Sequence, residues 1–179
     1  MSDDQPSALT PRDIGLLAAA AALILDQGSK LLMLYGFGFA QMAHECHQYS
    51  DPVPVLPFFN LAMVWNCGVS YGLFPASGPA GTAFLALFSV AAVAALGRWL
   101  WGAHRLTLTI GLGLVIGGAL GNLIDRLIYG KVADFFDFHL GTYHWYVFNV
   151  ADAAITFGVV ALLYDALLKP EVRTGKDGA

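Results

Sequence analysis

GGALGNLIDRLIYGKVADFFD, residues 117–137, is the stretch that decides how this chain is organised. It begins inside a long apolar run and ends in a polar connection. Asn122, Asp125 and Arg126 follow one another at steps that place all three on one face of a helix. Ionisable side chains at membrane depth are costly and by default mark a functional site. This helical face therefore predicts a functional site, and Asp125 needs a partner from another helix.

The same apolar run carries a glycine at every fourth position, at Gly113, Gly117 and Gly121. A stripe of small residues lets a second helix approach closely inside a membrane, where packing holds helices together. We therefore expect another helix of the chain to lie against this stripe.

The composition is typical of an integral membrane protein, because 57% of the 179 residues are hydrophobic and only 12% are charged. A membrane-spanning helix needs about 20 apolar residues. We predict an all-α integral membrane protein, a single membrane domain over residues 1–179, with spans at about 13–35, 80–101, 106–129 and 147–168. The 9 Lys and Arg residues are scattered along the chain. They form no basic surface of the kind that binds nucleic acid.

Two longer connections, residues 36–79 and 130–146, separate the predicted spans. The first is rich in proline and is too long to be structureless in a compact domain. Its segment Phe58–Trp65 combines aromatic and aliphatic residues between turn formers, which predicts a strand. We expect a small β-sheet at the membrane surface there. We expect a loop at 130–146. We interpret its Asp134 and Asp137 as solvated acids and keep as the lesser alternative that they border the site.

Positive charge distinguishes the two sides of the predicted bundle. The N-terminal tail, the turn between the second and third spans and the C-terminal tail together carry six Lys and Arg residues. The connection at 36–79 carries none, and the connection at 130–146 carries only Lys131. By the positive-inside rule, both termini face the cytoplasm and the two longer connections face outward.

This orientation places Asp26, Asp125 and Asp152, which come from three helices, at one depth near the outer surface. Two carboxylates held together in a poorly solvated site share a proton. One can then take a proton from water while the other protonates a leaving group, as in an aspartic protease. We predict that Asp125 and Asp152 form this pair, because each has an Asn three residues before it. Asp26 precedes Lys30 by four residues, which favours a structural ion pair.

Other interpretations of these carboxylates stay open at this point. The two aspartates could be separate structural residues in hydrogen bonds between helices. Together with Asp26 they could form the proton relay of a small proton-coupled carrier, or they could belong to a non-catalytic lipid-binding or assembly subunit. A relay should distribute ionisable groups through the depth of the bilayer. The inner halves of the predicted spans are apolar, which argues against the carrier.

The cysteines and nearby histidines do not predict a metal site. His44, Cys46 and His47 lack the spacing and the complete ligand set of a metal site. We expect no metal and no cofactor. Cys46 and Cys67 both lie in the outward connection, where a disulfide is permitted. Because spacing cannot show that two cysteines meet, we interpret both as free thiols.

Four segments, spread over most of the chain, resemble the motifs of the lipoprotein signal peptidases, also called signal peptidase II. They are DQGSK at 26–30, NCGVSYGLF at 66–74, GGALGNLIDR at 117–126 with VADFFDF at 132–138, and FNVADAAITFG at 148–158. Each motif alone is modest, but four in this order with matching spans are specific. Many members of this family have Ala and Phe where this chain has Ser70 and Tyr71, on a segment expected to face the substrate.

The resemblance implies a membrane aspartyl endopeptidase of the bacterial inner membrane. It would remove the signal peptide from diacylglyceryl-modified prolipoproteins by cutting before the lipidated cysteine. The family's catalytic pair maps onto Asp125 and Asp152. The supporting residues of its motifs map onto Asp26, Lys30, Asn66, Gly68, Asn122, Arg126 and Asn149. The resemblance also implies a periplasmic β-cradle formed by the small sheet, contact with membrane lipid and inhibition by globomycin-like antibiotics. We expect the protein to act as a monomer.

Overall fold

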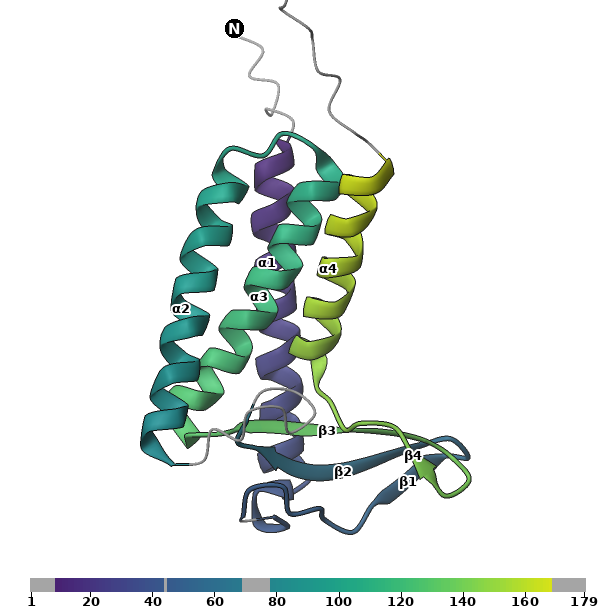
Figure 1. Cartoon of the computed structure of the whole chain (residues 1–179). Coiled ribbons are helices and arrows are strands. Elements are labelled where there is room, and N and C mark those ends of the chain that lie inside the picture. Colours follow the sequence, from purple (N-terminus) through teal and green to yellow (C-terminus); the bar gives the residue numbers. More distant parts are fainter. Residues whose placement is uncertain (1–8, 44, 69–77, 169–179) are drawn as a thin grey trace, which may run out of the picture.

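The structure, a computed structural model, describes residues 9–43, 45–68 and 78–168. Its four long helices lie side by side, with a small sheet across one end of the bundle (Figure 1). They are α1 at Pro11–Leu31, which continues as a π-helical turn over Leu32–Gly36, α2 at Pro79–Trp101, α3 at Leu106–Tyr129 and α4 at Val150–Leu168. All four are long and apolar enough to cross a membrane. The predicted fold class is confirmed.

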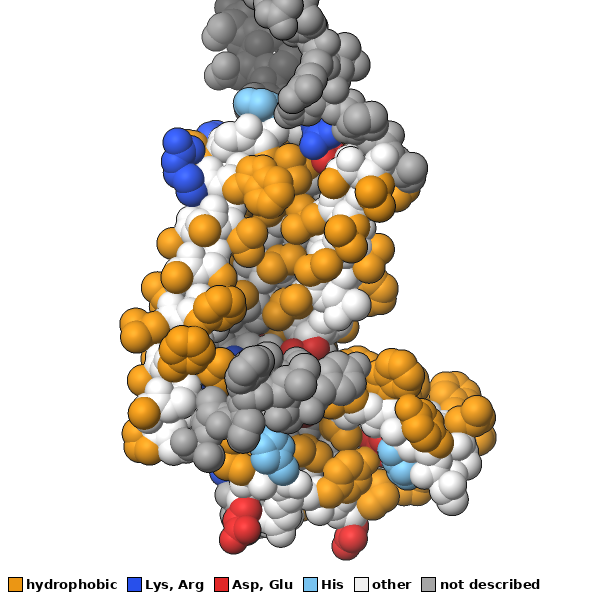
Figure 2. Space-filling model, viewed as in Figure 1, with side chains coloured by type: hydrophobic (Ala, Val, Ile, Leu, Met, Phe, Trp, Pro, Cys, Tyr) orange, Lys and Arg blue, Asp and Glu red, His pale blue; other side chains and the backbone are white. Residues whose placement is uncertain are grey.

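Helix α3 is the centre of the bundle, since α1, α2 and α4 all pack against it. The glycine stripe explains how closely α1 approaches. A Cβ atom at Gly113 would collide with the carbonyl oxygen of Gly15, and one at Gly117 would collide with that of Ala19. Most of α3 is buried, whereas most of α2 is exposed at the outside of the bundle. Hydrophobic side chains cover the visible flanks of the helices (Figure 2), which suits a lipid environment.

The sheet is antiparallel, with four strands in the order in which they occur along the chain. The strands are β1 at Val53–Leu56, β2 at Phe59–Asn66, β3 at Val132–Leu140 and β4 at Tyr143–His144. The predicted strand at Phe58–Trp65 corresponds to β2. The connection at 130–146, expected as a loop, instead supplies β3 and β4. A short 3₁₀ turn at Phe39–Gln41 precedes the sheet.

Pairing between β2 and β3 buries both acids that we interpreted as solvated, so that interpretation is wrong. Asp134 is 1% exposed and Asp137 is 0% exposed. The register places each opposite or near an asparagine of β2, and the amides satisfy the carboxylates. Asn66 donates to Asp134 at 3.0 Å, and Asn60 donates to Asp137 at 3.1 Å. These hydrogen bonds offset part of the free energy that burying a carboxylate costs.

A hydrophobic core joins the sheet to the end of α1. It consists of Met33, Leu34, Phe39, Ala43, Met63, Trp65, Ala133 and Phe135. The indole N–H of Trp65 donates to the carbonyl oxygen of Ala43 at 2.8 Å, so this buried aromatic leaves no unsatisfied polar atom. The core fixes β2 and β3 beneath the bundle, where their polar residues meet the helix ends.

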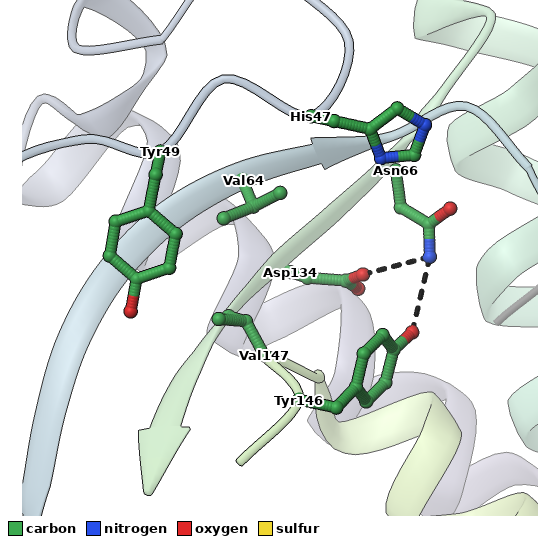
Figure 3. A pocket seen from close by; sticks show the side chains of 7 residues that line it. All are labelled: His47, Tyr49, Val64, Asn66, Asp134, Tyr146 and Val147. Carbon is green, nitrogen blue, oxygen red and sulfur yellow. Dashed lines mark hydrogen bonds between the residues drawn. The ribbon is translucent and has the colours of Figure 1, made fainter. Parts of the chain in front are cut away.

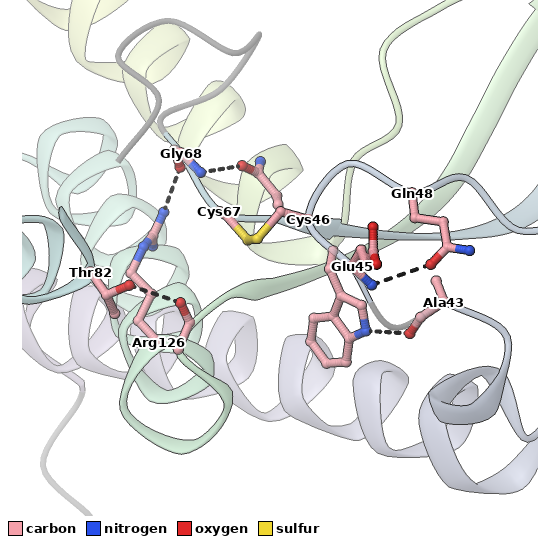
Figure 4. Close-up of a disulfide and its surroundings, with 11 residues drawn as sticks. Ala43, Glu45, Cys46, Gln48, Cys67, Gly68, Thr82 and Arg126 are labelled. Carbon is pink, nitrogen blue, oxygen red and sulfur yellow. Dashed lines mark hydrogen bonds between the residues drawn. A yellow bond between two sulfur atoms is a disulfide. The ribbon is translucent and has the colours of Figure 1, made fainter. Parts of the chain in front are cut away.

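A disulfide joins Cys46 to Cys67 (Figure 4), so the interpretation as free thiols is wrong. The two Cα atoms are 5.7 Å apart, within the usual range for a disulfide. The bond ties the turn that precedes Tyr49 to the end of β2, directly beside Asn66. The sequence could not show this, because the two cysteines are 21 residues apart and meet only when the sheet forms.

Candidate active site

Helix α1 supplies a buried cation at the level of the sheet. The side chain of Lys30 is 3% exposed and its ammonium group contacts Asp26 at 2.8 Å and Asp125 at 2.9 Å. A third N–H donates to Oδ1 of Asn122 at 3.0 Å. An ammonium group has three donors, so the cation is fully satisfied. The predicted pair between Asp26 and Lys30 is thus one side of a larger cluster.

Asp125 on α3 is enclosed by this cluster. Besides the ion pair to Lys30, its carboxylate accepts from Nε2 of Gln27 at 3.0 Å and from the backbone N–H of Ala133 at 3.1 Å. It is 1% exposed. It lines neither of the two cavities that reach the site. These contacts engage both carboxylate oxygens of Asp125 and hold α1, α3 and β3 together.

Asp152 is positioned by the way α4 begins. Oδ1 of Asn149 accepts from the backbone N–H of Asp152 at 2.9 Å, and Oδ2 of Asp152 accepts from the backbone N–H of Asn149 at 3.2 Å. These reciprocal bonds are those of a capping box, which satisfies donors at the start of a helix. The positive end of the helix dipole also favours a negative charge at this position. Local sequence alone therefore sets the position of Asp152 in the first turn of α4.

Two asparagines connect Asp152 to the rest of the site. Nδ2 of Asn122 donates to Oδ1 of Asp152 at 2.9 Å. Nδ2 of Asn149 donates to Oδ1 of Asn122 at 3.2 Å and to Oδ1 of Asp134 at 2.6 Å. Both amides are buried. Asn149 therefore lies between Asp134 and Asp152 and bonds to both.

Asp134 on β3 is the carboxylate that sequence reasoning missed. Its oxygens accept from Nδ2 of Asn149 and of Asn66, and no cation lies within ion-pair distance of it among the described residues. Burial raises the pKa of Asp134 well above its usual range, and the nearby charge of Asp152 raises it further. The segment VADFFDF, part of the third motif, was the available signal for this residue. It was read as a loop, so its pairing with β2 was not anticipated.

Two cavities approach this pair from different sides and share Tyr146 as a common wall. The sheet-side cavity, of about 320 Å³, reaches Asp134 and Asn66 (Figure 3). The helix-side cavity, of about 450 Å³, reaches Asp152 and runs past Ala153 and Phe157 on α4. The hydroxyl of Tyr146 accepts from Nδ2 of Asn66 at 3.2 Å. A chain that crosses from one cavity to the other would pass both carboxylates.

Arg126 holds the backbone of Gly68 beside the site. Its guanidinium donates to the carbonyl oxygen of Asn122 at 3.1 Å. It also donates to the carbonyl oxygen of Gly68 at 3.2 Å (Figure 4). The backbone N–H of Gly68 donates to Oδ1 of Asn66 at 3.0 Å. Arg126 therefore braces protein backbone at this end of α3. Ser70 and Tyr71 lie outside the described residues.

The structure brings every predicted site residue into one network of contacts. These are Asp26, Lys30, Asn66, Gly68, Asn122, Asp125, Arg126, Asn149 and Asp152. Gln27, Asp134 and Tyr146 join them without having been predicted. Within the described residues, no group of three or more His, Cys, Asp or Glu side chains could hold a metal ion. His44 lies outside that part of the chain.

The family model described as signal peptidase (SPase) II matches residues 18–168. The chain belongs to the signal peptidase II family. It is 49% identical over 164 residues to the lipoprotein signal peptidase of Rhodopseudomonas palustris strain TIE-1, covering 89% of this chain and 95% of that one. It is 47% identical over 165 residues to the lipoprotein signal peptidase of Nitrobacter hamburgensis, covering 90% and 96%.

Solved structures agree with this family assignment. One described as a bacterial membrane enzyme solved by the in meso method at 2.3 Å resolution superimposes with a TM-score of 0.71. It is 27% identical and covers 92% of this chain and 93% of that one. As a member of the signal peptidase II family, this chain is a multi-pass peptidase of a bacterial membrane. The predicted signal peptidase function is confirmed, and the carrier alternative is not favoured.

Proposed function

We propose that this signal peptidase II is an aspartic endopeptidase that removes signal peptides from diacylglyceryl-modified prolipoproteins, with Asp134 and Asp152 as its catalytic pair. One observation supports the choice of pair above all. Two carboxylates from different elements are joined through Asn149, and each lines a cavity that a substrate could occupy. The proposal keeps the predicted Asp152 and replaces the predicted Asp125 with Asp134.

Charge distribution favours Asp134 over Asp125. An acid–base pair needs one carboxyl that stays protonated near neutral pH. Asp125 contacts the ammonium of Lys30 at 2.9 Å and accepts further hydrogen bonds, so its oxygens are engaged in contacts that hold the fold together. Asp134 is buried and lies near the negative charge of Asp152, and these two effects on its pKa outweigh the lowering by the hydrogen bonds from Asn66 and Asn149. These surroundings favour the protonated form.

The same comparison suggests which carboxylate holds the shared proton. Burial raises the pKa of Asp134. Asp152 accepts from Asn122 and from the backbone at the start of α4, where the helix dipole favours negative charge. In the resting enzyme Asp134 is therefore the acid and Asp152 the base.

Hydrolysis then follows in two proton-balanced steps. Asp152 takes a proton from a water molecule as the water oxygen attacks the scissile carbonyl carbon, and Asp134 gives its proton to the carbonyl oxygen. The resulting tetrahedral species has two hydroxyl groups. Asp134 recovers a proton from one hydroxyl as the C–N bond breaks, and Asp152 gives its proton to the leaving amine. Both carboxyl groups return to their starting states.

The remaining polar residues hold the pair in position. Asn149 bonds to both carboxylates, and Asn122 joins Asp152 to the cluster around Lys30. Their donors and acceptors are used within the network, so the rotamers are restricted before substrate binds. Such preorganisation reduces the reorganisation needed during the reaction.

The depth of the site suits a lipidated substrate. The pair lies where the helix ends meet the sheet, while Arg12, Arg98 and Arg105 lie at the opposite end of the bundle (Figures 1 and 2). The positive-inside rule then places both termini in the cytoplasm and the site toward the periplasm. A diacylated cysteine would fix its peptide bond at that depth, close to membrane lipid. A globomycin-like inhibitor would compete with the substrate for the same site. A single chain supplies all the residues of the proposed site, so the protein should act as a monomer.

Cleavage of a defined precursor tests the function. The purified full-length protein in detergent should release the signal peptide from a diacylglyceryl-modified precursor, and mass spectrometry should show the lipidated cysteine as the new N-terminus. The matched precursor without lipid should be cleaved far more slowly, and a globomycin-like compound should inhibit the reaction. Equal cleavage of both precursors, or cutting at another bond, would contradict the proposal.

A further inference from the structure

The described residues that line the sheet-side cavity belong to β2, to β3 and to the segments before β1 and α4. Its walls are Val64 on β2, His47 and Tyr49 from the segment before β1, and Tyr146 and Val147 from the segment before α4 (Figure 3). Its volume of about 320 Å³ is at the lower end of the range for ligand pockets, roughly 300–1,000 Å³. A space of this size suits one side chain of a bound peptide.

The disulfide sets the position of this cavity's outer wall. Cys46 is directly before His47 and is bonded to Cys67, directly after Asn66. The backbone N–H of His47 donates to the carbonyl oxygen of Trp65 at 2.9 Å. The ring of Tyr49 is held as well, because its hydroxyl is hydrogen-bonded to Asp137. The wall is therefore built before any substrate arrives.

The direction of a lipidated precursor decides which part of it meets this cavity. The signal peptide and the acyl chains must both stay in the membrane, on the side of the helix-side cavity along α4. The mature chain after the cysteine must leave the membrane at the end of the bundle where the sheet lies (Figure 1), and the sheet-side cavity is lined by residues of β2 and β3. In an extended peptide, successive side chains point in opposite directions. If the lipidated cysteine points toward the membrane, the next side chain points toward the sheet.

We propose that the sheet-side cavity is a specificity subsite for the residue immediately after the lipidated cysteine, and that it prefers an uncharged, apolar side chain. Val64 and Val147 offer apolar contact, and the rings of Tyr49 and Tyr146 close the sides. Among the described residues that line it there is no Lys or Arg, while Asp134 is present, so an acidic side chain would face a carboxylate there. This inference rests on the proposed function, because it takes the precursor as the substrate.

Two lipidated precursors that differ only in this residue, Gly or Leu, test the inference. For the unchanged protein we expect kcat/KM to be about tenfold higher for Leu, because burying part of its side chain is worth about 1.4 kcal/mol. Val64→Phe fills the cavity from β2 and should bring the ratio to about one. Val64→Ala, which only removes wall contacts, should lower it to about threefold.

Phe157→Ala is the matched control, because Phe157 lines only the other cavity and is exposed. It should leave the Leu-to-Gly ratio unchanged, whatever it does to both rates. Equal kcat/KM for the two precursors in the unchanged protein would overturn the subsite while leaving the proposed function intact. A ratio that follows Phe157 rather than Val64 would do the same. Failure to cleave either precursor would refute the proposed function, and this inference with it.

Discussion

The exchange of Asp134 for Asp125 in the catalytic pair can be tested by replacing each carboxylate with its amide. Asp134→Asn removes the acid while it preserves size and leaves Asn66 and Asn149 in place. General acid–base catalysis contributes roughly 10²–10⁴ in rate. Because the acid and base act as a unit, we expect kcat to fall by at least about 10³. Adding Asp152→Asn should then cost little more, since catalytic groups of this kind are strongly non-additive.

The effect of Asp134→Asn on stability should be small, because two effects oppose each other. The amide cannot accept from both Asn66 and Asn149, and the loss of a buried hydrogen bond costs about 1–3 kcal/mol. A carboxyl whose pKa is raised by burial opposes folding when it ionises, and the amide cannot ionise. We therefore expect the thermal midpoint to change by no more than a few degrees in either direction. The combination of lost activity with retained stability is specific to a catalytic role.

Asp125→Asn should behave in the opposite way. Its carboxylate accepts from Lys30, Gln27 and Ala133. The amide oxygen cannot replace all three bonds, and a buried polar group left without its partner costs about 1–3 kcal/mol. For a chain of this size that lowers the thermal midpoint by roughly 2–4 °C per kcal/mol. Lys30 still forms its ion pair with Asp26 in this variant. Activity should therefore fall only in proportion to the amount of folded protein that is lost.

Single-turnover cleavage of a lipidated precursor, together with thermal unfolding in the same detergent, measures both quantities for each variant. The reasoning fails if folded Asp134→Asn cleaves at near-normal rates. It fails equally if folded Asp125→Asn loses activity as completely as Asp152→Asn without losing stability. Either result would return Asp125 to the catalytic pair.

Three further predictions follow from the same contacts. Activity should fall as pH rises through the raised pKa of Asp134, because the acid is lost, and the free energy of unfolding should fall over the same pH range. A pH–rate profile and unfolding measured at each pH check both. The change in stability with pH should be absent in Asp134→Asn. Replacing Cys46 and Cys67 together by Ser should lower stability by about 3 kcal/mol, given the 21-residue separation, and raise KM more than it lowers kcat. Gly117→Leu should prevent folding, assayed by expression and thermal midpoint, because its side chain would meet the backbone of Ala19; Gly97→Leu on α2, where a Cβ meets nothing within 4 Å, is the control.

Local sequence patterns determined the membrane fold and part of the site. The four spans follow from the length of the apolar runs, and the glycine stripe at Gly113 and Gly117 predicted the close helix that proved to be α1. The position of Asp152 could be predicted because its capping partner, Asn149, is only three residues earlier in the chain. Depth along a helix is a property of the helix alone, so these features needed no knowledge of distant residues.

Only the tertiary structure shows that Asp134 and Asp152 both bond to Asn149, and that Asp125 instead forms an ion pair with Lys30. Asp125 is turned toward Lys30 by the packing of α3 against α1, and Asp134 is buried because β3 pairs with β2 from a connection more than sixty residues earlier. The disulfide between Cys46 and Cys67 depends on that same sheet. Helix rotation and strand register are set by contacts between segments far apart along the chain. Hydrophobic periodicity reports burial within one segment and carries no information about its partner.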